Sequence, residues 1–245
     1  MSLFVTILLA SFAESLVSFI GGVLAFLNAE TIRRFAHFVV SFAVGALLAV
    51  SFLDLIPEAV AMSSLEFVMP LVMAGMILFF VLEKFLFWYH CHEGKCPVHT
   101  YTYLILWGDF LHNFIDGVII ALTFMVDVKL GVLTTFAVIL HEIPQEIGDF
   151  GILLHGGFSK KRALFYNFLV STSTILGAIL TFSMGTALGP FIPVGLALAA
   201  GNFIYLAATD LMPELHESSK FSHSIGQVAL IILGAILVIL PEFIL

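Results

Sequence analysis

Long apolar runs, interrupted by short polar linkers, make up almost the whole chain. Eight of them are long enough to cross about 30 Å of hydrocarbon, at approximately residues 3–27, 35–60, 67–89, 101–126, 131–155, 162–183, 188–213 and 222–243. No linker has the length of a soluble domain. The pattern therefore predicts an all-α integral membrane protein, with residues 1–245 forming a single polytopic domain of eight transmembrane helices.

Composition agrees with this prediction. Of the 245 residues, 61% are hydrophobic and only 11% are charged, and the mean hydropathy is +1.14. One soluble core of this size cannot bury so much apolar surface. The formal net charge of −8 says little about surfaces, because many of the acids lie inside apolar runs. We therefore expect the lipid bilayer, and no nucleic acid, among the partners.

The basic residues predict the orientation in the membrane. All Lys and Arg residues except Lys129 lie in or beside the first, third, fifth and seventh linkers. Because cytoplasmic linkers are enriched in Lys and Arg, these linkers are expected to face the cytoplasm. Both chain termini are then extracytoplasmic, as an even number of spans requires.

One short motif occurs twice. Gly45 is followed after eight residues by Asp54–Glu58 (Asp-Leu-Ile-Pro-Glu), and Gly201 is followed after eight residues by Asp210–Glu214 (Asp-Leu-Met-Pro-Glu). The two runs that carry the motif cross the membrane in opposite directions, which is typical of the inverted repeats of transporters. Each Pro-Glu pair could simply end a span at the interface, but the matched spacing favours a 3+2+3 inverted repeat.

Two neighbouring runs carry metal-binding residue types near their middles. They are His112, Asn113 and Asp116 in the fourth run and His141, Glu142 and Gln145 in the fifth. Residues three and four apart share a helical face, and the short linker Asp127–Leu130 forces the two helices to lie antiparallel and close together. A charged group at this depth costs several kcal/mol unless it is paired, hydrated or coordinated. Hydrogen bonding between helices explains one such residue, but a bound cation explains six on facing stripes better.

The mixture of imidazole with carboxylate and amide oxygens suits borderline divalent ions. Zn²⁺ is expected first, followed by Fe²⁺, Mn²⁺ and Cd²⁺. Pro144 removes a backbone N–H, so the fifth helix should kink beside the site. Four further side chains are expected to line the ion's route, with helix pairing or an interfacial position as alternatives: Asp109, Glu146, Asp149 and His155.

Two other features stay open. Glu14 stands alone as an acidic residue in the first run and serves either helix pairing or function. The linker His90–His99 contains Cys91 and Cys96, and it either receives metal or is an ordinary solvated linker. Its Cys-x₄-Cys spacing is not typical of a structural zinc site.

Taken together, the motifs resemble those of the ZIP (Zrt-, Irt-like protein) family of divalent metal transporters. Gly108–Gly117 resembles the family's fourth helix, and His141–Phe150 is similar to a fifth helix that reads His-Glu-x-Pro-His-Glu-x-Gly-Asp-Phe. Gly45–Ala59 and Ala200–Leu215 resemble the second and seventh helices. The resemblance implies metal uptake across the plasma membrane by elevator-like alternating access, with helices 1, 4, 5 and 6 moving against helices 2, 3, 7 and 8. It also implies metal ligation at the six positions named above.

The chain departs from the family pattern where some members hold two metals through bridging glutamates. Position 116 is Asp, position 145 is Gln, and the sixth run reads Ser171–Thr174 without a carboxylate. We therefore expect one well-occupied metal site rather than two.

Alternatives to transport are weaker. His141-Glu142 begins like the His-Glu-x-x-His of a zinc hydrolase, but the fifth position is Gln145, and Pro144 interrupts the helix. A metal sensor would need an output domain, which the short linkers do not provide. No phosphate-binding Gly-rich loop with its Lys is present, so ATP-driven transport by this chain alone is not expected. The sequence thus predicts a secondary transporter with Zn²⁺ as substrate, not an enzyme, and leaves open whether it forms a homodimer.

Overall fold

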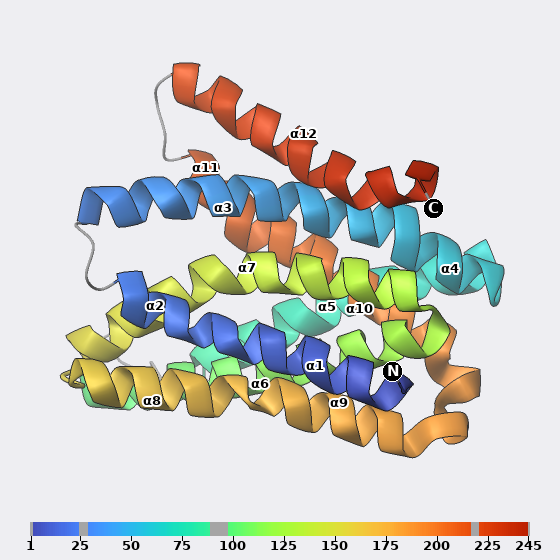
Figure 1. Ribbon diagram of the computed structural model, residues 1–245, viewed down its shortest axis with the longest axis horizontal. Coiled ribbons are helices and arrows are strands. Elements are labelled where there is room, and N and C mark those ends of the chain that lie inside the picture. The colour runs from blue at the N-terminus through green and yellow to red at the C-terminus, as the bar shows by residue number, and fades with distance from the viewer. Residues whose placement is uncertain (1, 25–28, 89–97, 217–220, 245) are drawn as a thin grey trace.

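The computed structural model describes residues 2–24, 29–88, 98–216 and 221–244, and within them every regular element is a helix (Figure 1). Five segments are long and apolar enough to cross a membrane: Phe38–Ala61, Leu65–Lys84, Leu106–Val126, Lys160–Met184 and Ala187–Leu211. Two shorter helical segments, Leu3–Ser18 and Ser224–Leu240, are also apolar. The prediction of an all-α fold is therefore confirmed for the described residues. The segment 90–97, with Cys91 and Cys96, lies outside them.

In chain order the helices are α1 (Leu3–Ser15), η1 (Leu16–Ser18), α2 (Phe19–Leu24), α3 (Ala29–Ala49), η2 (Val50–Leu55), α4 (Ile56–Ala61), α5 (Leu65–Trp88), α6 (Val98–Val126), α7 (Val128–His155), α8 (Lys160–Ser171), α9 (Ser173–Met184), η3 (Gly185–Phe191), α10 (Ile192–Leu206), η4 (Ala207–Leu211), α11 (Met212–His216) and α12 (Phe221–Ile244). Here η1 and η3 are 3₁₀ helices, whereas η2 and η4 are π-helical.

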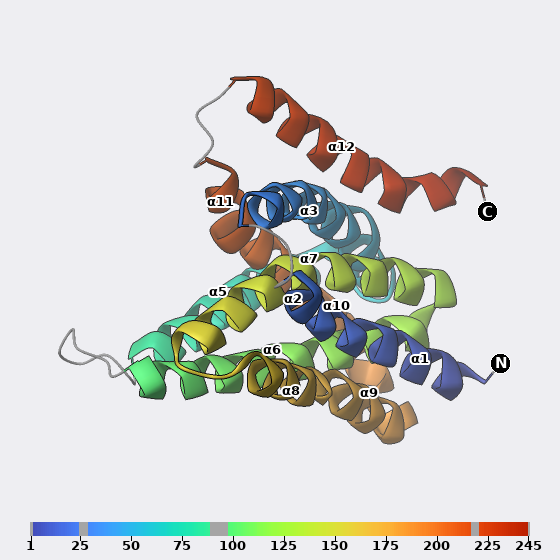
Figure 2. The ribbon, with the colours of Figure 1, turned by 60° about the vertical axis from the view of Figure 1, so that its left-hand side comes forward.

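Helix α7 lies in the middle of the bundle. It contacts α1, α2, α6 and α8 as well as α3. Figure 2 shows α3 and α12 on one side of α7, and α8 and α9 on the other. Helix α1 begins and α12 ends at the same end of the bundle (Figure 1). A side chain on α7 can therefore meet groups from several helices that are distant in sequence.

A single residue, Asp127, separates α6 from α7. Its carboxylate caps α7 by accepting hydrogen bonds from the N–H groups of Lys129 at 2.8 Å and Leu130 at 3.2 Å. This is the usual role of an aspartate at a helix N-terminus. The stretch predicted as a linker therefore adds three residues to the helix, which begins at Val128 and not at residue 131. The tight turn keeps α6 and α7 adjacent.

The two repeated motifs adopt the same unusual backbone. Each contains a π-helical turn that ends at the Leu of its Leu-x-Pro-Glu sequence, at Val50–Leu55 and at Ala207–Leu211. The N–H of Ile56 donates to Ser51 and the N–H of Met212 donates to Ala207, five residues back in both cases. Proline lacks an N–H, and in an α-helix its ring crowds the carbonyl four residues back. The wider π-helical turn relieves this crowding.

The glycines of the two motifs lie at close helix crossings. A Cβ atom on Gly45 of α3 would stand 1.9 Å from the carbonyl oxygen of Ile231 on α12. A Cβ atom on Gly201 of α10 would stand 2.2 Å from the carbonyl oxygen of Val72 on α5. No side chain fits at either position without separating the backbones. Helix α3 is thus packed tightly on α12, and α10 is packed tightly on α5.

Replacing either motif glycine by alanine should lower the stability of the protein. We expect Gly201→Ala and Gly45→Ala each to cost about 1–3 kcal/mol, because the added methyl group overpacks a backbone contact. Thermal unfolding of the detergent-purified protein measures the effect. Gly226→Ala on α12 is the matched control, since nothing lies within 4 Å of the added Cβ there. Equal midpoints for Gly201→Ala and Gly226→Ala would contradict the close crossing.

Candidate metal centre

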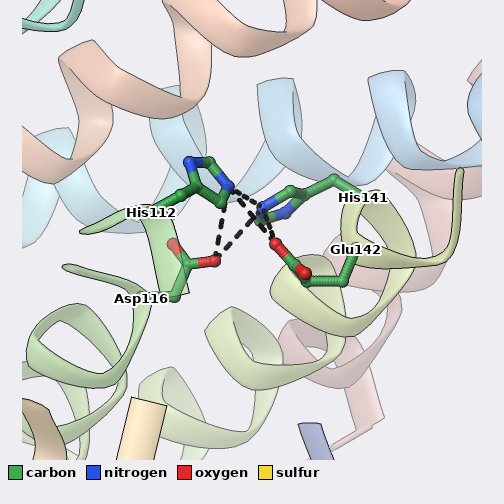
Figure 3. Close-up of side chains that lie close together, drawn as sticks. All are labelled: His112, Asp116, His141 and Glu142. Carbon is green, nitrogen blue, oxygen red and sulfur yellow. Dashed lines mark hydrogen bonds and ion pairs between the residues drawn. The ribbon is translucent and has the colours of Figure 1, made fainter. Parts of the chain in front are cut away.

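Two imidazoles from adjacent helices meet near the middle of the bundle (Figure 3). The Nε2 atoms of His112 on α6 and His141 on α7 lie 3.1 Å apart. Asp116 follows His112 by one helical turn, and Glu142 follows His141 directly. As a result, both carboxylates point toward the imidazole pair (Figure 3). The polar stripes predicted on the two helices do face each other.

The four side chains present one donor atom each at metal-binding separation. His112 Nε2 lies 3.3 Å from Glu142 Oε1 and 3.7 Å from Asp116 Oδ2, and His141 Nε2 lies 3.5 Å and 3.3 Å from the same two oxygens. Ligands placed 2.0–2.1 Å from a tetrahedral zinc ion stand roughly 3.3–3.4 Å from one another. The measured separations therefore fit a single small tetrahedral ion among two nitrogens and two oxygens.

The second nitrogen of His141 orients its ring. His141 Nδ1 lies 3.3 Å from the carbonyl oxygen of Ala137, one turn earlier on α7. If Nδ1 carries the proton and donates to this carbonyl, the lone pair of Nε2 points at the other donors. Such a hydrogen bond from the remote ring nitrogen is common among metal-binding histidines.

The centre is buried but not closed. Asp116, His141 and Glu142 are at most 1% exposed, whereas the side chain of His112 is 16% exposed. Both oxygens of Asp116 and of Glu142 lack a hydrogen-bond donor. Their nearest polar neighbours are the imidazole nitrogens at 3.3–3.7 Å, and a cation held among all four side chains would offset the cost of burying two carboxylates. His112 is the member of the group whose side chain is partly exposed.

Asn113 and Gln145, the other two predicted ligands, lie one step away from this group. Asn113 Nδ2 donates to Asp109 Oδ1 at 2.7 Å, and its Oδ1 accepts from the Thr174 hydroxyl at 3.2 Å. Gln145 Nε2 donates to the same Asp109 oxygen at 3.3 Å. The structure therefore brings four of the six predicted ligands together and turns both amide nitrogens toward Asp109.

Of the residues predicted to line the ion's route, Asp109 lies on α6, and Glu146, Asp149 and His155 follow one another along α7. Glu146 and Asp109 are fully buried, Asp149 is half-buried, and His155 is exposed at the end of the helix. Pro144 lies inside α7, whose helical assignment continues to His155. Figure 2 shows the two halves of this helix running in different directions, as expected for a proline kink.

Helix α1 and the 3₁₀ turn η1 that follows it carry a buried polar face that includes Glu14. Ser11, Glu14, Ser15 and Ser18 are all completely buried. Their spacing of three and four residues places them on one side of the helix. The three serines spaced around Glu14 are the feature of the sequence that indicates this polar face. A single acidic residue in an apolar run does not indicate one. The hydroxyl of Ser15 donates to the backbone carbonyl of Ser171 on α8 at 3.0 Å.

Glu14 brings a further carboxylate close to the metal centre. It neighbours the Thr174 hydroxyl and lies within electrostatic reach of Glu142 and Asp116. Its Oε1 atom is buried without a hydrogen-bond donor.

Comparison with known proteins supplies independent information. A family model described as ZIP zinc transporter matches residues 90–241. The chain is 35% identical over 221 residues to zinc transporter ZIP13 of Pongo abelii, covering 82% of this chain and 65% of the relative. It is 40% identical over 146 residues to zinc transporter foi of Drosophila melanogaster, covering 58% and 20%.

A third relative is named for a broader activity. The chain is 42% identical over 125 residues to metal cation symporter ZIP14 of Xenopus tropicalis, covering 50% of this chain and 26% of the relative. In each of the three comparisons the chain spans less than two thirds of the relative's length. All three relatives are named as transporters or symporters, and none of these names describes an enzyme.

Proposed function

Because the chain belongs to the ZIP zinc transporter family and is a multi-pass membrane protein, we propose that it is a secondary transporter that carries divalent metal ions across the plasma membrane into the cytoplasm. The ion binds midway across the membrane between α6 and α7. The observation that carries this proposal is the convergence of His112, Asp116, His141 and Glu142 at the spacing of a tetrahedral metal shell.

Zn²⁺ is the proposed principal substrate. Two imidazole nitrogens with two carboxylate oxygens suit a borderline ion that accepts tetrahedral geometry. Fe²⁺, Mn²⁺ and Cd²⁺ tolerate the same ligands and are proposed as secondary substrates. The name of the ZIP14 relative, a metal cation symporter, is compatible with this breadth.

We further propose that residues 1–245 form one domain that crosses the membrane eight times as a 3+2+3 inverted repeat, with extracytoplasmic termini. Support comes from the paired motifs, which share a π-helical turn and a glycine crossing. The contacts are also reciprocal: α10 packs on η2 and α4, and α3 packs on η4 and α11. An approximate two-fold axis that exchanges α3 with α10 accounts for both sets of contacts.

The proposed movement is elevator-like, with α1, α2 and α6–α9 sliding against α3–α5 and α10–α12. The contacts support this division, because α6 packs on α9 and α1 on α9 within one set, while α3 packs on α12 and α10 on α5 within the other. The surface between the sets has apolar contacts, such as the edge-on pair of Phe42 on α3 and Phe136 on α7, whose ring centroids are 6.2 Å apart. An aromatic contact of this kind carries no directional hydrogen bond of its own.

A zinc-dependent hydrolase is the less supported alternative. Its His-Glu-x-x-His motif needs a second imidazole at position 145, but this position is Gln145, whose amide donates to Asp109. Purified protein in liposomes loaded with a zinc-sensitive dye tests the proposal. Transport predicts saturable dye response to external Zn²⁺ without ATP. Peptide or lipid cleavage without zinc entry would overturn the proposal and favour the hydrolase.

Glu14 should strengthen the attraction of the site for cations. We expect Glu14→Gln to raise the Zn²⁺ concentration for half-maximal uptake by roughly threefold to tenfold, because it removes a nearby negative charge in a low-dielectric setting. Ser11→Ala on the same face of α1 is the neutral control and should leave this concentration unchanged. If the two variants behave alike, Glu14 serves only helix packing.

A further inference from the structure

Three consecutive basic residues stand at the start of α8, at the outer edge of the bundle (Figure 1). They are Lys160, Lys161 and Arg162, which make up a third of the nine Lys and Arg residues of the chain. All three are exposed. The sequence has no Asp or Glu between Asp149 and Asp210. Helices α8 and α9 therefore carry concentrated positive charge at one end and no negative charge of their own.

Two aromatic rings hold the guanidinium group of Arg162. Its Cζ atom lies 4.4 Å from the ring centroid of Phe158 and 5.6 Å from that of Tyr166, and the two centroids are 5.5 Å apart. Phe158 is buried, so the contact is anchored in the protein interior. A contact with the face of a ring does not neutralise the cation. A guanidinium placed in this way offers a planar set of N–H donors that matches the oxygens of a phosphate group.

A side-chain cap fixes the position where α8 begins. Ser159 Oγ accepts a hydrogen bond from the N–H of Arg162 at 3.3 Å. Gly157, with a φ of 88°, turns the chain from the end of α7 toward this cap. Because the first turn of the helix already has its acceptor, an anion at this end is recognised by the basic side chains and not by the backbone N–H groups.

An exposed apolar stripe leads away from the basic end along α8 and α9. Phe165 is 60% exposed, Leu169 is 50% exposed and Leu176 is 55% exposed. They follow Lys161 by four, eight and fifteen residues, a spacing that places all of them on one face of the helical segment. This segment, Lys160–Met184, is long and apolar enough to cross a membrane. The stripe is therefore expected to face hydrocarbon.

The length of the stripe corresponds to one leaflet. From Phe165 to Leu176 it extends about 17 Å at 1.5 Å per residue. The hydrocarbon of one leaflet is roughly 15 Å deep, half of the bilayer core. An acyl chain whose headgroup lies at the basic end can thus run along the whole stripe.

We propose that the basic end of α8 and the apolar stripe together bind one anionic phospholipid. Its phosphate contacts Lys161 and Arg162, with Lys160 adding charge beside them, and one acyl chain lies along Phe165 and Leu169. Clusters of basic residues at a membrane surface attract anionic lipids. Under the proposed orientation this end of α8 lies at the cytoplasmic leaflet, whose surface is negatively charged.

The basic residues of this linker also follow the charge rule for membrane orientation. That rule counts Lys and Arg residues and requires no particular arrangement of them. The ring-held guanidinium of Arg162 and the alignment of Phe165, Leu169 and Leu176 below Lys161 are features of arrangement. Orientation therefore does not account for them, whereas a bound phospholipid does.

Phospholipid binding to the detergent-purified full chain tests the proposal. Native mass spectrometry counts the lipids that the protein retains during titration with phosphatidylglycerol or with phosphatidylcholine of the same acyl chains. We expect the first phosphatidylglycerol to bind at least tenfold more tightly than the first phosphatidylcholine. Combined Lys160→Gln, Lys161→Gln and Arg162→Gln should abolish this preference, because each basic residue near the surface contributes about fivefold in affinity.

Two variants serve as controls. Lys84→Gln removes an exposed positive charge from the end of α5 and should keep the preference for phosphatidylglycerol. Arg162→Lys keeps the charge but loses the planar donors, and it should weaken phosphatidylglycerol binding by roughly twofold to fivefold. An unchanged unfolding midpoint is required of each variant. If the triple variant fails this criterion, Lys160→Gln with Lys161→Gln replaces it.

A soluble competitor separates a lipid site from a phosphate site. Glycerol phosphate carries the charged group without acyl chains, so it should not displace phosphatidylglycerol at equal concentration. Displacement would indicate a site for soluble phosphate compounds and would overturn the lipid proposal. Equal affinity of the wild-type chain for the two phospholipids would also overturn it, as would a preference that survives removal of the basic residues. None of these measurements depends on zinc uptake, so their failure leaves the proposed transport function standing.

Discussion

Zinc uptake into liposomes should fall by roughly a hundredfold or more when His141 is replaced by Ala, because the site then loses one of four ligands. The loss also leaves Asp116 and Glu142 facing each other across a buried gap without the imidazole between them. His112→Ala should have a comparable effect, since its Nε2 lies 3.3 Å and 3.7 Å from the same two oxygens. Initial rates of dye response across a range of Zn²⁺ concentrations give both the maximal rate and the half-saturating concentration.

The control for this experiment is His216→Ala, which changes an exposed histidine at the end of α11, outside the centre. It should transport at the wild-type rate, so that a general effect of losing a histidine is excluded. Each variant is also compared for its amount in the liposome membrane. Wild-type uptake by His141→Ala would remove the histidine pair from the transport pathway.

A covalent link between α3 and α7 should stop transport. Phe42 and Phe136 form an aromatic contact between the two proposed sets of helices. We expect Phe42→Cys with Phe136→Cys, in a chain whose Cys91 and Cys96 are changed to Ser, to lose most of its uptake on cross-linking with a short bifunctional reagent that can be cleaved by reduction. Reduction should restore uptake, because sliding of one set past the other is then possible again.

A cross-link within one set is the matched control. Phe4 of α1 and Phe182 of α9 have ring centroids 5.1 Å apart, and both helices belong to the set proposed to move. Phe4→Cys with Phe182→Cys should therefore transport equally well before and after cross-linking. Full transport by the cross-linked α3–α7 pair would show that these two helices do not move apart, and the elevator proposal would fail.

The metal centre shows how far spacing alone can reach. The three- and four-residue spacing placed six polar residues on two facing stripes, and four of them meet as a ligand group. The sequence cannot tell whether an amide points its oxygen at a metal or its nitrogen at a carboxylate, because one bond rotation exchanges the two. Asn113 and Gln145 donate to Asp109 since that buried carboxylate lies within their reach.

Contacts between helices that are distant in sequence could not be predicted from the sequence either. Asn167 meets Glu146, and Glu14 meets Thr174, only because α8, α1 and α9 pack around α6 and α7. Gly45 and Gly201 were recognised as parts of a repeated motif, but their partners on α12 and α5 depend on how the helices cross. Likewise, the start of α7 at Val128 follows from a side-chain cap that a hydropathy pattern does not reveal.

The amino-acid sequence alone determined the helical class, the membrane setting, the repeated motif and the two polar stripes proposed to bind metal, because each depends on local periodicity or on apolar length. Only the tertiary structure decided which donor atoms converge, and it brought carboxylates from α6 and α7 to the same pair of imidazoles. The physical reason is that ligation depends on distances of a few ångströms between atoms, and in this bundle those distances are set by interhelical packing.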